Sequence, residues 1–325
     1  FWLTGERRYY DEFRAQVTDW IDANRPGFGV NWACTMDVAI RAVNWTWGFA
    51  LFRKALQDDR PFASLLLRAL FAHGRFIAAN PERGDDVNSN HYFADLLGML
   101  FLGVLFHGAP EADAWRGTAI AEIVRENAAQ TLPDGADYEA SIPYHRLMTE
   151  MALTALLLIE RSGYRLPDLR GRVRAMIDYI AHYTKPDGLA PQIGDNDDGR
   201  LQILGDYDAD RRDHRHLLAV ARCGFDDPAL LRPAAPRWGG ALRLTGNQPE
   251  ARLRVAAARP PQRRGVGIGG GQRERRRQGR DEDGGACGSF HGISSRVSWA
   301  MGMRRSKRRT PPCGRDHSAG AGTAG

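Results

Sequence analysis

The feature that most limits what this chain can fold into is its helical periodicity. Between residues 8 and 222, apolar side chains recur every three to four positions, the spacing that gathers them on one face of an α-helix. A strand needs alternation at every second position, and almost none is found before Ala235. The predicted helices cover residues 8–23, 32–56, 61–79, 93–106, 110–130, 143–161, 169–183 and 213–222.

Consecutive predicted helices are of similar length and are joined by loops, which suits helical hairpins. Several are apolar on more than one face, as helices packed between two layers are. The sequence therefore predicts an all-α fold, an incomplete (α/α) toroid of helical hairpins; a helical bundle fits the same pattern. No run approaches the roughly 20 apolar residues of a membrane span, so no membrane-spanning segment is expected.

The composition changes abruptly near Leu244. Residues 246–325 carry 17 Lys and Arg against 6 Asp and Glu, whereas residues 1–245 carry 28 against 33. We therefore expect a helical domain over residues 1–244 and a low-complexity Arg/Gly-rich tail over residues 245–325, which holds too few large apolar residues for a core. The tail is interpreted as largely disordered or as non-native sequence from a reading-frame slip. Because the helical part is acidic, no nucleic-acid partner is expected.

Ligand spacings give no reason to assign a metal or a cofactor. The four cysteines show no CxxC or Cys/His ligand pattern; they are Cys34, Cys223, Cys287 and Cys313. Cys34 and Cys223 are expected to be small core residues. The acidic loop of residues 194–200 lacks the carboxylate that closes a calcium loop at its twelfth position, so a structural loop is expected there.

Two polar stretches, residues 87–92 and 134–146, each stand at the start of an apolar helical run. They supply an amide, an imidazole and a phenol, groups that can act on a sugar acid without a metal. The predicted catalytic residues are Asn90, His91 and Tyr144. Each also has a structural alternative: Asn is a preferred helix N-cap, His can be a satisfied helix-start residue, and Tyr can be a buried aromatic.

Five sequence blocks in this order resemble the heparinase II/III-like polysaccharide lyases, over roughly residues 1–244. The blocks are Gly29-Val-Asn31-Trp32, the run from Met36 to Trp45, Ser89-Asn90-His91, the run from Asp134 through Glu139 to Tyr144-His145-Arg146, and the run from Pro191 to Arg200. The resemblance implies an N-terminal α/α toroid, a following β-sandwich and an active cleft between them. A His- and Asp-rich strand segment, with a zinc site in some members, is not found in this sequence.

The resemblance also implies cleavage of a glycosidic bond by β-elimination beside a uronic acid. The family's catalytic asparagine matches Asn90 and its catalytic tyrosine matches Tyr144. Asn90 would hold the uronate carboxylate, His91 would assist or act as base, and Tyr144 would act as acid and base, helped by nearby donor groups because a free phenol has a pKa of roughly 10.

Further residues are predicted to bind the polysaccharide. Tyr138 is a candidate stacking surface and Glu139 a candidate for orienting Tyr144, His91 or a sugar hydroxyl. Arg41 and Asn44 share a helix face at i, i+3, although a structural ion pair is an equal alternative for Arg41. The full set of predicted binding residues is Arg41, Asn44, Trp32, Tyr138, Glu139, His145 and Arg146.

Other functions remain open at this stage. A glycoside hydrolase on a similar toroid would need two carboxylates across the bond, for which Asp134, Glu139 and Asp195 are available. A non-catalytic polysaccharide-binding domain, or a lyase inactive without its second domain, fits as well. We expect an acidic polysaccharide, unsulfated or lightly sulfated, as the partner, and a periplasmic or secreted protein whose signal peptide would precede Phe1.

Overall fold

The computed structural model of the chain describes residues 1, 4–84, 87–196, 199–202, 210–231, 242–245 and 252–255. Asp197, Asp198, Cys287, Cys313 and most of the predicted basic tail lie outside these residues. The helices are α1 (Arg8–Ala23), α2 (Thr35–Leu51), α3 (Arg53–Asp58), α4 (Arg60–Ala79), α5 (Asn90–Leu105), α6 (Pro110–Gln130), α7 (Ile142–Arg161), α8 (Pro167–Tyr183) and α9 (Arg215–Phe225), with 3₁₀ turns η1 (Val30–Trp32) and η2 (Pro228–Leu231).

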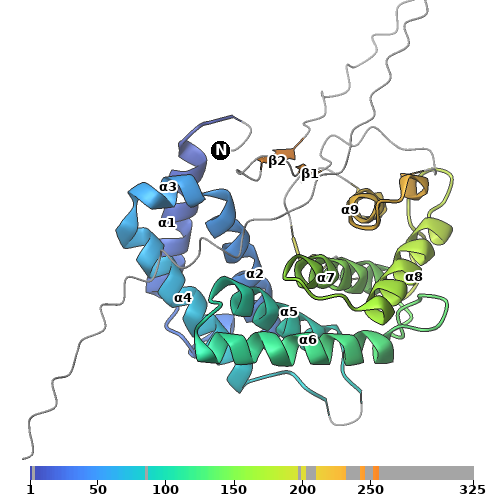
Figure 1. Cartoon of the computed structure of the whole chain (residues 1–325), viewed down its shortest axis with the longest axis horizontal. Coiled ribbons are helices and arrows are strands. Elements are labelled where there is room, and N and C mark those ends of the chain that lie inside the picture. Colours follow the sequence, from blue (N-terminus) through green and yellow to red (C-terminus); the bar gives the residue numbers. More distant parts are fainter. Residues whose placement is uncertain are drawn as a thin grey trace, which may run out of the picture.

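The helices follow one another around an open arc (Figure 1). Helix α2 contacts α5, and α5 contacts α7, which forms an inner layer; α4, α6 and α8 contact one another in sequence and form an outer layer. Each inner helix thus packs between neighbours of its own layer and an outer helix. This arrangement confirms the predicted all-α fold of paired helices.

Helix α5 lies at the centre of the arc and has the most enclosed position. Fourteen of its 16 residues are buried, and it contacts α2, α4, α6 and α7. A helix surrounded in this way can be apolar on every face, which is why its sequence shows little amphipathic contrast. The described core extends on both sides of it, from Tyr10 to Leu230.

Several helix boundaries differ from the sequence prediction by a few residues, and two of the differences have a local cause. The segment predicted as one helix over residues 32–56 is divided at Phe52, whose backbone leaves helical angles (φ −99°, ψ 11°) while its ring stacks on Phe13 with centroids 5.0 Å apart. The helix predicted to start at residue 93 begins at Asn90, because Ser89 adopts an extended conformation and accepts a hydrogen bond from the His91 N–H through its side chain.

Two short strands, β1 (Leu242–Thr245) and β2 (Arg252–Val255), pair in antiparallel register with Leu242 opposite Val255. They lie beyond α9, and β1 contacts that helix. The sequence pattern did not predict this hairpin, since its strands are four residues long and fall at the change of composition.

Helix α4 is the described helix that is long and apolar enough, by length and composition, to cross a membrane. In this fold four of its large apolar residues, Phe62, Leu66, Leu70 and Ile77, are buried, and the helix contacts α1, α2 and α5. One face of α4 therefore belongs to the core of the domain.

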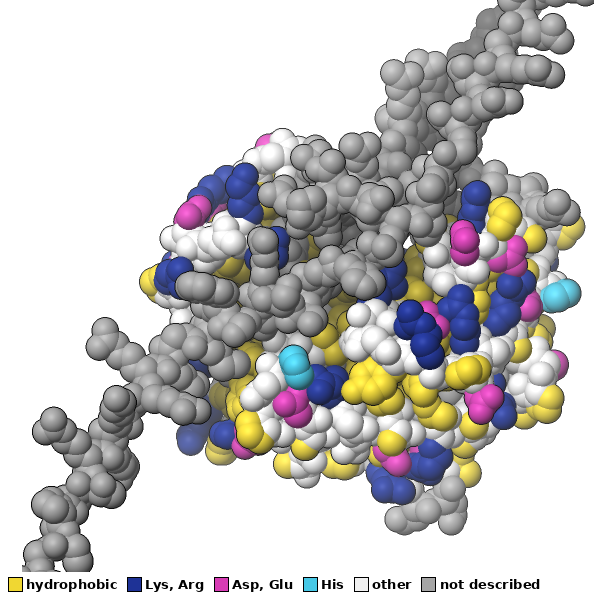
Figure 2. Space-filling view, in the orientation of Figure 1, with side chains coloured by type: hydrophobic (Ala, Val, Ile, Leu, Met, Phe, Trp, Pro, Cys, Tyr) yellow, Lys and Arg dark blue, Asp and Glu magenta, His cyan; other side chains and the backbone are white. Residues whose placement is uncertain are grey.

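Charged side chains of both signs are interspersed among the described residues on the face shown in Figure 2. Several arginines pair with acidic residues, for example Arg170 with Glu160 at 2.8 Å and Arg174 with Asp227 at 2.7 Å. Surface pairs of this kind contribute little stability each, but they offset the positive charge of the arginines locally.

Candidate functional site

The candidate site is built around the first turn of α5. Ser89 caps this helix, so Asn90 is not the N-cap that its residue type also suggested, and its side chain is available for other contacts. Asn90 is 5% exposed, whereas the neighbouring His91 side chain is 47% exposed. One end of a fixed helix therefore presents a buried amide beside an accessible imidazole.

Asn90 is held by Glu139, which comes from the segment before α7. The Asn90 Nδ2 lies 2.9 Å from Glu139 Oε1 and 3.1 Å from Oε2, and the Asn90 backbone N–H donates to Oε1 at 3.1 Å. The two oxygens of a carboxylate subtend a much narrower angle at Nδ2 than the two amide N–H bonds do, so one N–H is shared between them. The second N–H of the amide has no acceptor among the residues that the structure describes.

The backbone near Glu139 explains how it reaches Asn90. Gly135 has φ 92°, and a Cβ there would lie 2.2 Å from the Ala175 carbonyl oxygen, so only glycine fits this close approach to α8. Ala140 also adopts a left-handed φ of 55°, which costs about 1–2 kcal/mol for a residue with a Cβ. The carboxylate also lies at the N-terminus of α5, where a helix favours negative charge.

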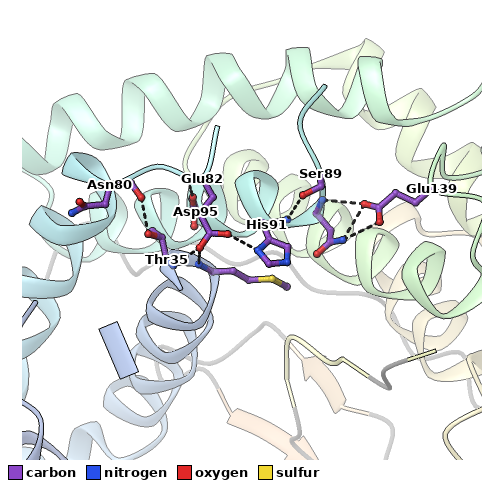
Figure 3. A network of polar contacts seen from close by, with 9 residues as sticks. Thr35, Asn80, Glu82, Ser89, His91, Asp95 and Glu139 are labelled. Atoms are coloured by element: carbon purple, nitrogen blue, oxygen red, sulfur yellow. Dashed lines mark hydrogen bonds and ion pairs between the residues drawn. The ribbon is translucent and has the colours of Figure 1, made fainter. Parts of the chain in front are cut away.

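His91 belongs to a network of polar contacts that joins the starts of α2 and α5 (Figure 3). Its Nδ1 contacts Glu82 Oε2. The other oxygen, Glu82 Oε1, accepts hydrogen bonds from the backbone N–H groups of Thr35 and Met36, and the Glu82 N–H donates to Asp95 Oδ2 at 2.7 Å. Glu82 therefore links the first turn of α2 to His91.

Tyr138 and Tyr144 flank the Glu139 segment. The Tyr138 hydroxyl donates to the Asn88 carbonyl at 2.8 Å, which joins the segment before α7 to the loop before α5. Tyr144 lies in the first turn of α7, where Ser141 caps the helix and accepts from the Tyr144 N–H at 3.2 Å. The Tyr144 side chain is half-buried and packs against the core.

Two predicted binding residues, Asn44 and Arg146, hold the loop of residues 199–202 instead. Asn44 Nδ2 donates to the Leu201 carbonyl at 2.8 Å, and Arg146, 3% exposed, donates to the Gly199 carbonyl. Glu150, which lies 3.5 Å from Arg146, accepts from the Leu201 and Gln202 N–H groups. Both side chains are thus bonded within the fold, and their contact with substrate stays a prediction.

His145 is likewise a core residue. It is 1% exposed, its Nε2 lies 3.1 Å from the Met176 carbonyl oxygen, and its ring packs against Tyr179 with centroids 4.9 Å apart. Burial lowers the pKa of His145 to about 4, which keeps the ring neutral at physiological pH. The predicted contact of His145 with substrate stays a prediction.

Arg41 and Trp32 meet in a separate aromatic cluster at η1. The Arg41 guanidinium lies 4.2 Å from the Trp20 ring centroid and 5.3 Å from that of Trp32, and its Nε donates to His73 Nε2 at 2.9 Å. Burial lowers the pKa of Arg41 to about 10. Trp32 is 4% exposed. Both residues pack within this cluster, and their binding of polysaccharide stays a prediction.

Sequence reasoning missed two buried carboxylates beside the predicted residues. Asp95 is fully buried, and burial raises its pKa to about 8. Asp137 is 4% exposed, and burial together with the charge of Glu139 raises its pKa to about 7. Asp95 lies four residues after His91, on the same face of α5, and this spacing could have indicated that it lies near the site. Glu82 and Asp137 have no such helical spacing to a predicted site residue.

The Cys34 thiol also lies close to the side chains of Glu82 and His91. One ligand atom of each lies within 4.8 Å of the others, a set that zinc could bridge after small shifts. Glu82 is already bonded to two backbone N–H groups and to His91, and burial raises the pKa of the Cys34 thiol to about 11. This chemistry suits a hydrogen-bonded cluster, and we assign no metal to it. Cys223, predicted to be a core residue, is exposed.

The carboxylates available to a hydrolase are differently placed. Glu139 is bonded to Asn90, whereas Asp134 is exposed and its Oδ1 accepts from the Ala136 N–H at 3.0 Å within a turn. Asp195 is exposed, and its carbonyl accepts from the Ser141 hydroxyl at 2.6 Å. Asp134 and Asp195 therefore have local roles in the turns around the α7 start.

A two-layered arc of helical hairpins, with an amide, an imidazole and a carboxylate at the start of a central helix, defines an α/α-toroid domain with a polar site. Residues 1–208 match the family described as Heparinase II/III N-terminus. The chain belongs to this family, which confirms the resemblance drawn from the sequence.

The individual relatives described next have low sequence identity to this chain. A heparin-sulfate lyase of Pedobacter heparinus is 24% identical over 202 residues, which cover 59% of this chain and 30% of that protein. The crystal structure of Heparinase III superposes with a TM-score of 0.54 at 17% identity, over 69% of this chain and 34% of that one. The structure of heparan sulfate lyase HepC from Pedobacter heparinus gives 0.52 at 20%, over 75% and 39%. The chain thus spans about a third of the length of these relatives.

Proposed function

We propose that this chain provides the helical part of a polysaccharide lyase that cleaves an acidic, uronic-acid-containing polysaccharide by β-elimination. Family membership and the lyase activity named for its relative support the reaction class. The observation that carries the proposal is the Asn90 amide, which both carboxylate oxygens of Glu139 hold through Nδ2. We infer that the second N–H of this amide is directed to the substrate.

β-Elimination beside a uronic acid removes the weakly acidic proton at C5. The adjacent carboxylate must accept hydrogen bonds so that the enolate-like charge that develops on it is stabilised. The free N–H of Asn90 supplies such a bond without a charge partner. Because Glu139 holds the amide before substrate arrives, no orientation has to be fixed during the reaction.

His91 and Tyr144 take the remaining roles. His91 is accessible beside Asn90 and either strengthens the neutralisation of the carboxylate or removes the C5 proton. Tyr144, at the start of α7, transfers a proton to or from the sugar as acid or base. Glu139 acts as the residue that orients Asn90, and Tyr138 fixes the segment that carries Glu139 through its bond to Asn88.

For the substrate, the relatives' names indicate heparin or heparan sulfate, and alginate is a second uronate polymer to include. A highly sulfated chain would need clustered Lys and Arg, whereas the arginines of this domain include several paired with acidic residues, such as Arg75 with Glu111. We therefore favour a lightly sulfated or unsulfated polymer, met in the periplasm or outside the cell.

The test is the ultraviolet absorbance of the unsaturated uronate that elimination leaves at the new chain end. Heparan sulfate and alginate are incubated with the wild-type chain and with two variants. Tyr144→Phe should lower the rate about 10²–10⁴-fold, and Asn90→Ala about 10²–10³-fold. Tyr164→Phe, at an exposed tyrosine, and Asn24→Ala, at the end of α1, serve as matched controls and should leave the rate unchanged.

Three results would count against the proposal. Saturated products would indicate a hydrolase. Binding of the polymer without any product would indicate a non-catalytic binding domain or a lyase that is inactive without its second domain. Unchanged rates in both Asn90→Ala and Tyr144→Phe would remove these residues from the reaction.

A further inference from the structure

We propose that Glu82 is a positioning residue that fixes the ring of His91 by accepting from Nδ1, so that Nε2 is presented to the polysaccharide. The inference rests on the proposed function and adds a residue to it. Glu82 lies in the loop between α4 and α5, eight residues before Asn90, and belongs to neither polar stretch that the sequence singled out.

Glu82 is held in place from three directions. Its Oε1 faces the first turn of α2 and accepts from the Thr35 and Met36 N–H groups, where the helix dipole favours a carboxylate. Its own N–H donates to the fully buried Asp95. Oε2 is the atom that contacts His91 Nδ1. Backbone and side chain are thus both anchored, and the remaining oxygen is directed at the imidazole (Figure 3).

The charge state of Glu82 favours one tautomer of His91. Burial alone would raise the pKa of Glu82, but hydrogen bonds from His91, Cys34 and Thr35 outweigh it and lower that pKa, so the side chain is a carboxylate. A carboxylate only accepts hydrogen bonds. In the neutral ring Nδ1 therefore carries the proton, and Nε2 is left as the acceptor.

Exposure decides which nitrogen is accessible to a ligand. The Glu82 side chain is 26% exposed and the His91 side chain 47% exposed, and His91 Nε2 has no hydrogen bond to any residue that the structure describes. The ring therefore has one nitrogen directed into the protein and one available to a ligand. An accessible Nε2 acceptor one residue from Asn90 lies where a proton beside a bound uronate would have to be removed.

Nitrogen-15 NMR of the full chain labelled at histidine tests this assignment directly. The chain has nine histidines, and the His91→Gln variant identifies the signals of His91. In the neutral ring, the wild type should show a protonated Nδ1 and an unprotonated Nε2. The opposite tautomer in the wild type would overturn the proposal, and this measurement needs no Glu82 variant to fold.

The Glu82→Gln variant tests the cause. A glutamine keeps an oxygen for the α2 N–H groups but can turn its NH₂ toward Nδ1, so the Nε2–H tautomer should gain population. The turnover number should fall about 10–100-fold, the cost typical of removing an orienting partner, with little change in KM. Glu111→Gln, at an exposed glutamate that pairs with Arg75, is the control. Unchanged His91 signals in Glu82→Gln would overturn the proposal.

The same spectra separate this inference from its alternatives. If no polymer is cleaved but the wild-type and Glu82→Gln spectra behave as expected, the proposed function fails and the control of the His91 tautomer by Glu82 stands. If purified protein carries one equivalent of zinc that Cys34→Ser removes and Cys223→Ser does not, Nδ1 is a metal ligand and the proposal is overturned. The expected result is that Cys34→Ser leaves the His91 signals unchanged.

Discussion

At the scale of single residues, the carboxylates of the site differ in how many hydrogen bonds they accept. Glu82 and Glu139 each accept several hydrogen bonds, and at Glu82 these bonds lower the pKa and favour the charged form. Asp95 accepts from the Glu82 N–H, while its Oδ1 is buried without a partner among the described residues. Burial therefore dominates at Asp95 and favours its neutral form.

Asp95 should make the stability of the domain depend on pH. Burial raises its pKa from the 3.8 of an ordinary Asp side chain to about 8, so between these values the folded state binds a proton that the unfolded state has lost. The free energy of unfolding should therefore fall as the pH rises from about 4 to about 8. Asp95→Asn keeps an acceptor for Glu82 and should flatten this fall, as measured by urea unfolding at several pH values. An equal slope in both proteins, with exposed Asp134→Asn as the control, would contradict the assignment.

The sequence indicates Asn90 and His91 because amide and imidazole stand together at a helix start. It does not indicate that Ser89 takes the cap, since Ser and Asn are both preferred there and only the backbone angles distinguish them. Glu82 and Glu139 could not be connected to the site from the sequence, because contacts across 9 and 49 positions depend on how α2, α5 and α7 pack.

At the scale of elements, close approach of α2 and α5 brings Thr35 near Glu82. Gly98 of α5 makes this approach possible: a Cβ at Gly98 would lie 2.8 Å from the Ala39 Cβ and 3.2 Å from the Ile77 Cδ1. Real side chains do not pack at 2.8 Å, so the helices would have to separate.

Gly98→Ala should therefore destabilise the domain by about 1–3 kcal/mol. Gly117→Ala is the matched control, because Gly117 is an exposed residue of α6 with nothing within 4 Å of an added Cβ; there alanine should stabilise by about 1 kcal/mol through helix propensity. The two free energies of unfolding, measured in urea, should change in opposite directions. A gain in stability at both positions would show that α2 and α5 are not in close contact.

Most helices could be predicted from the sequence because apolar side chains recur every three to four positions on their buried faces. The Phe52 break could not, since an aromatic residue within a periodic run gives no stop signal. The structural roles of Asn44 and Arg146 could not be predicted either: their side chains are the right types for binding sugar, and only the position of residues 199–202 shows that they bond the backbone there.

At the scale of the whole molecule, the described core lies between Tyr10 and Leu230, within the predicted helical domain. We expect residues 256–325 to add little to its stability. A chain ending after β2, at residue 255, should unfold at the same urea concentration as the full chain. A chain ending at residue 209 loses α9 and its buried Leu217 and Leu218, each contributing about 1.5–3 kcal/mol, and should unfold at a lower concentration. A large loss on removing residues 256–325 would contradict the predicted domain boundary.

The enclosure of α5 determines which part of the site can adapt to a ligand. Amide protons in a helix covered on all sides exchange with solvent only through large-scale opening, so its interior amides should be among the slowest to take up deuterium. Asn90 and His91 begin this slowly exchanging helix, whereas Tyr138 and Glu139 lie in a connecting loop. Under the proposed function, we expect any adjustment to sugar shape to occur in that loop and not at the helix end.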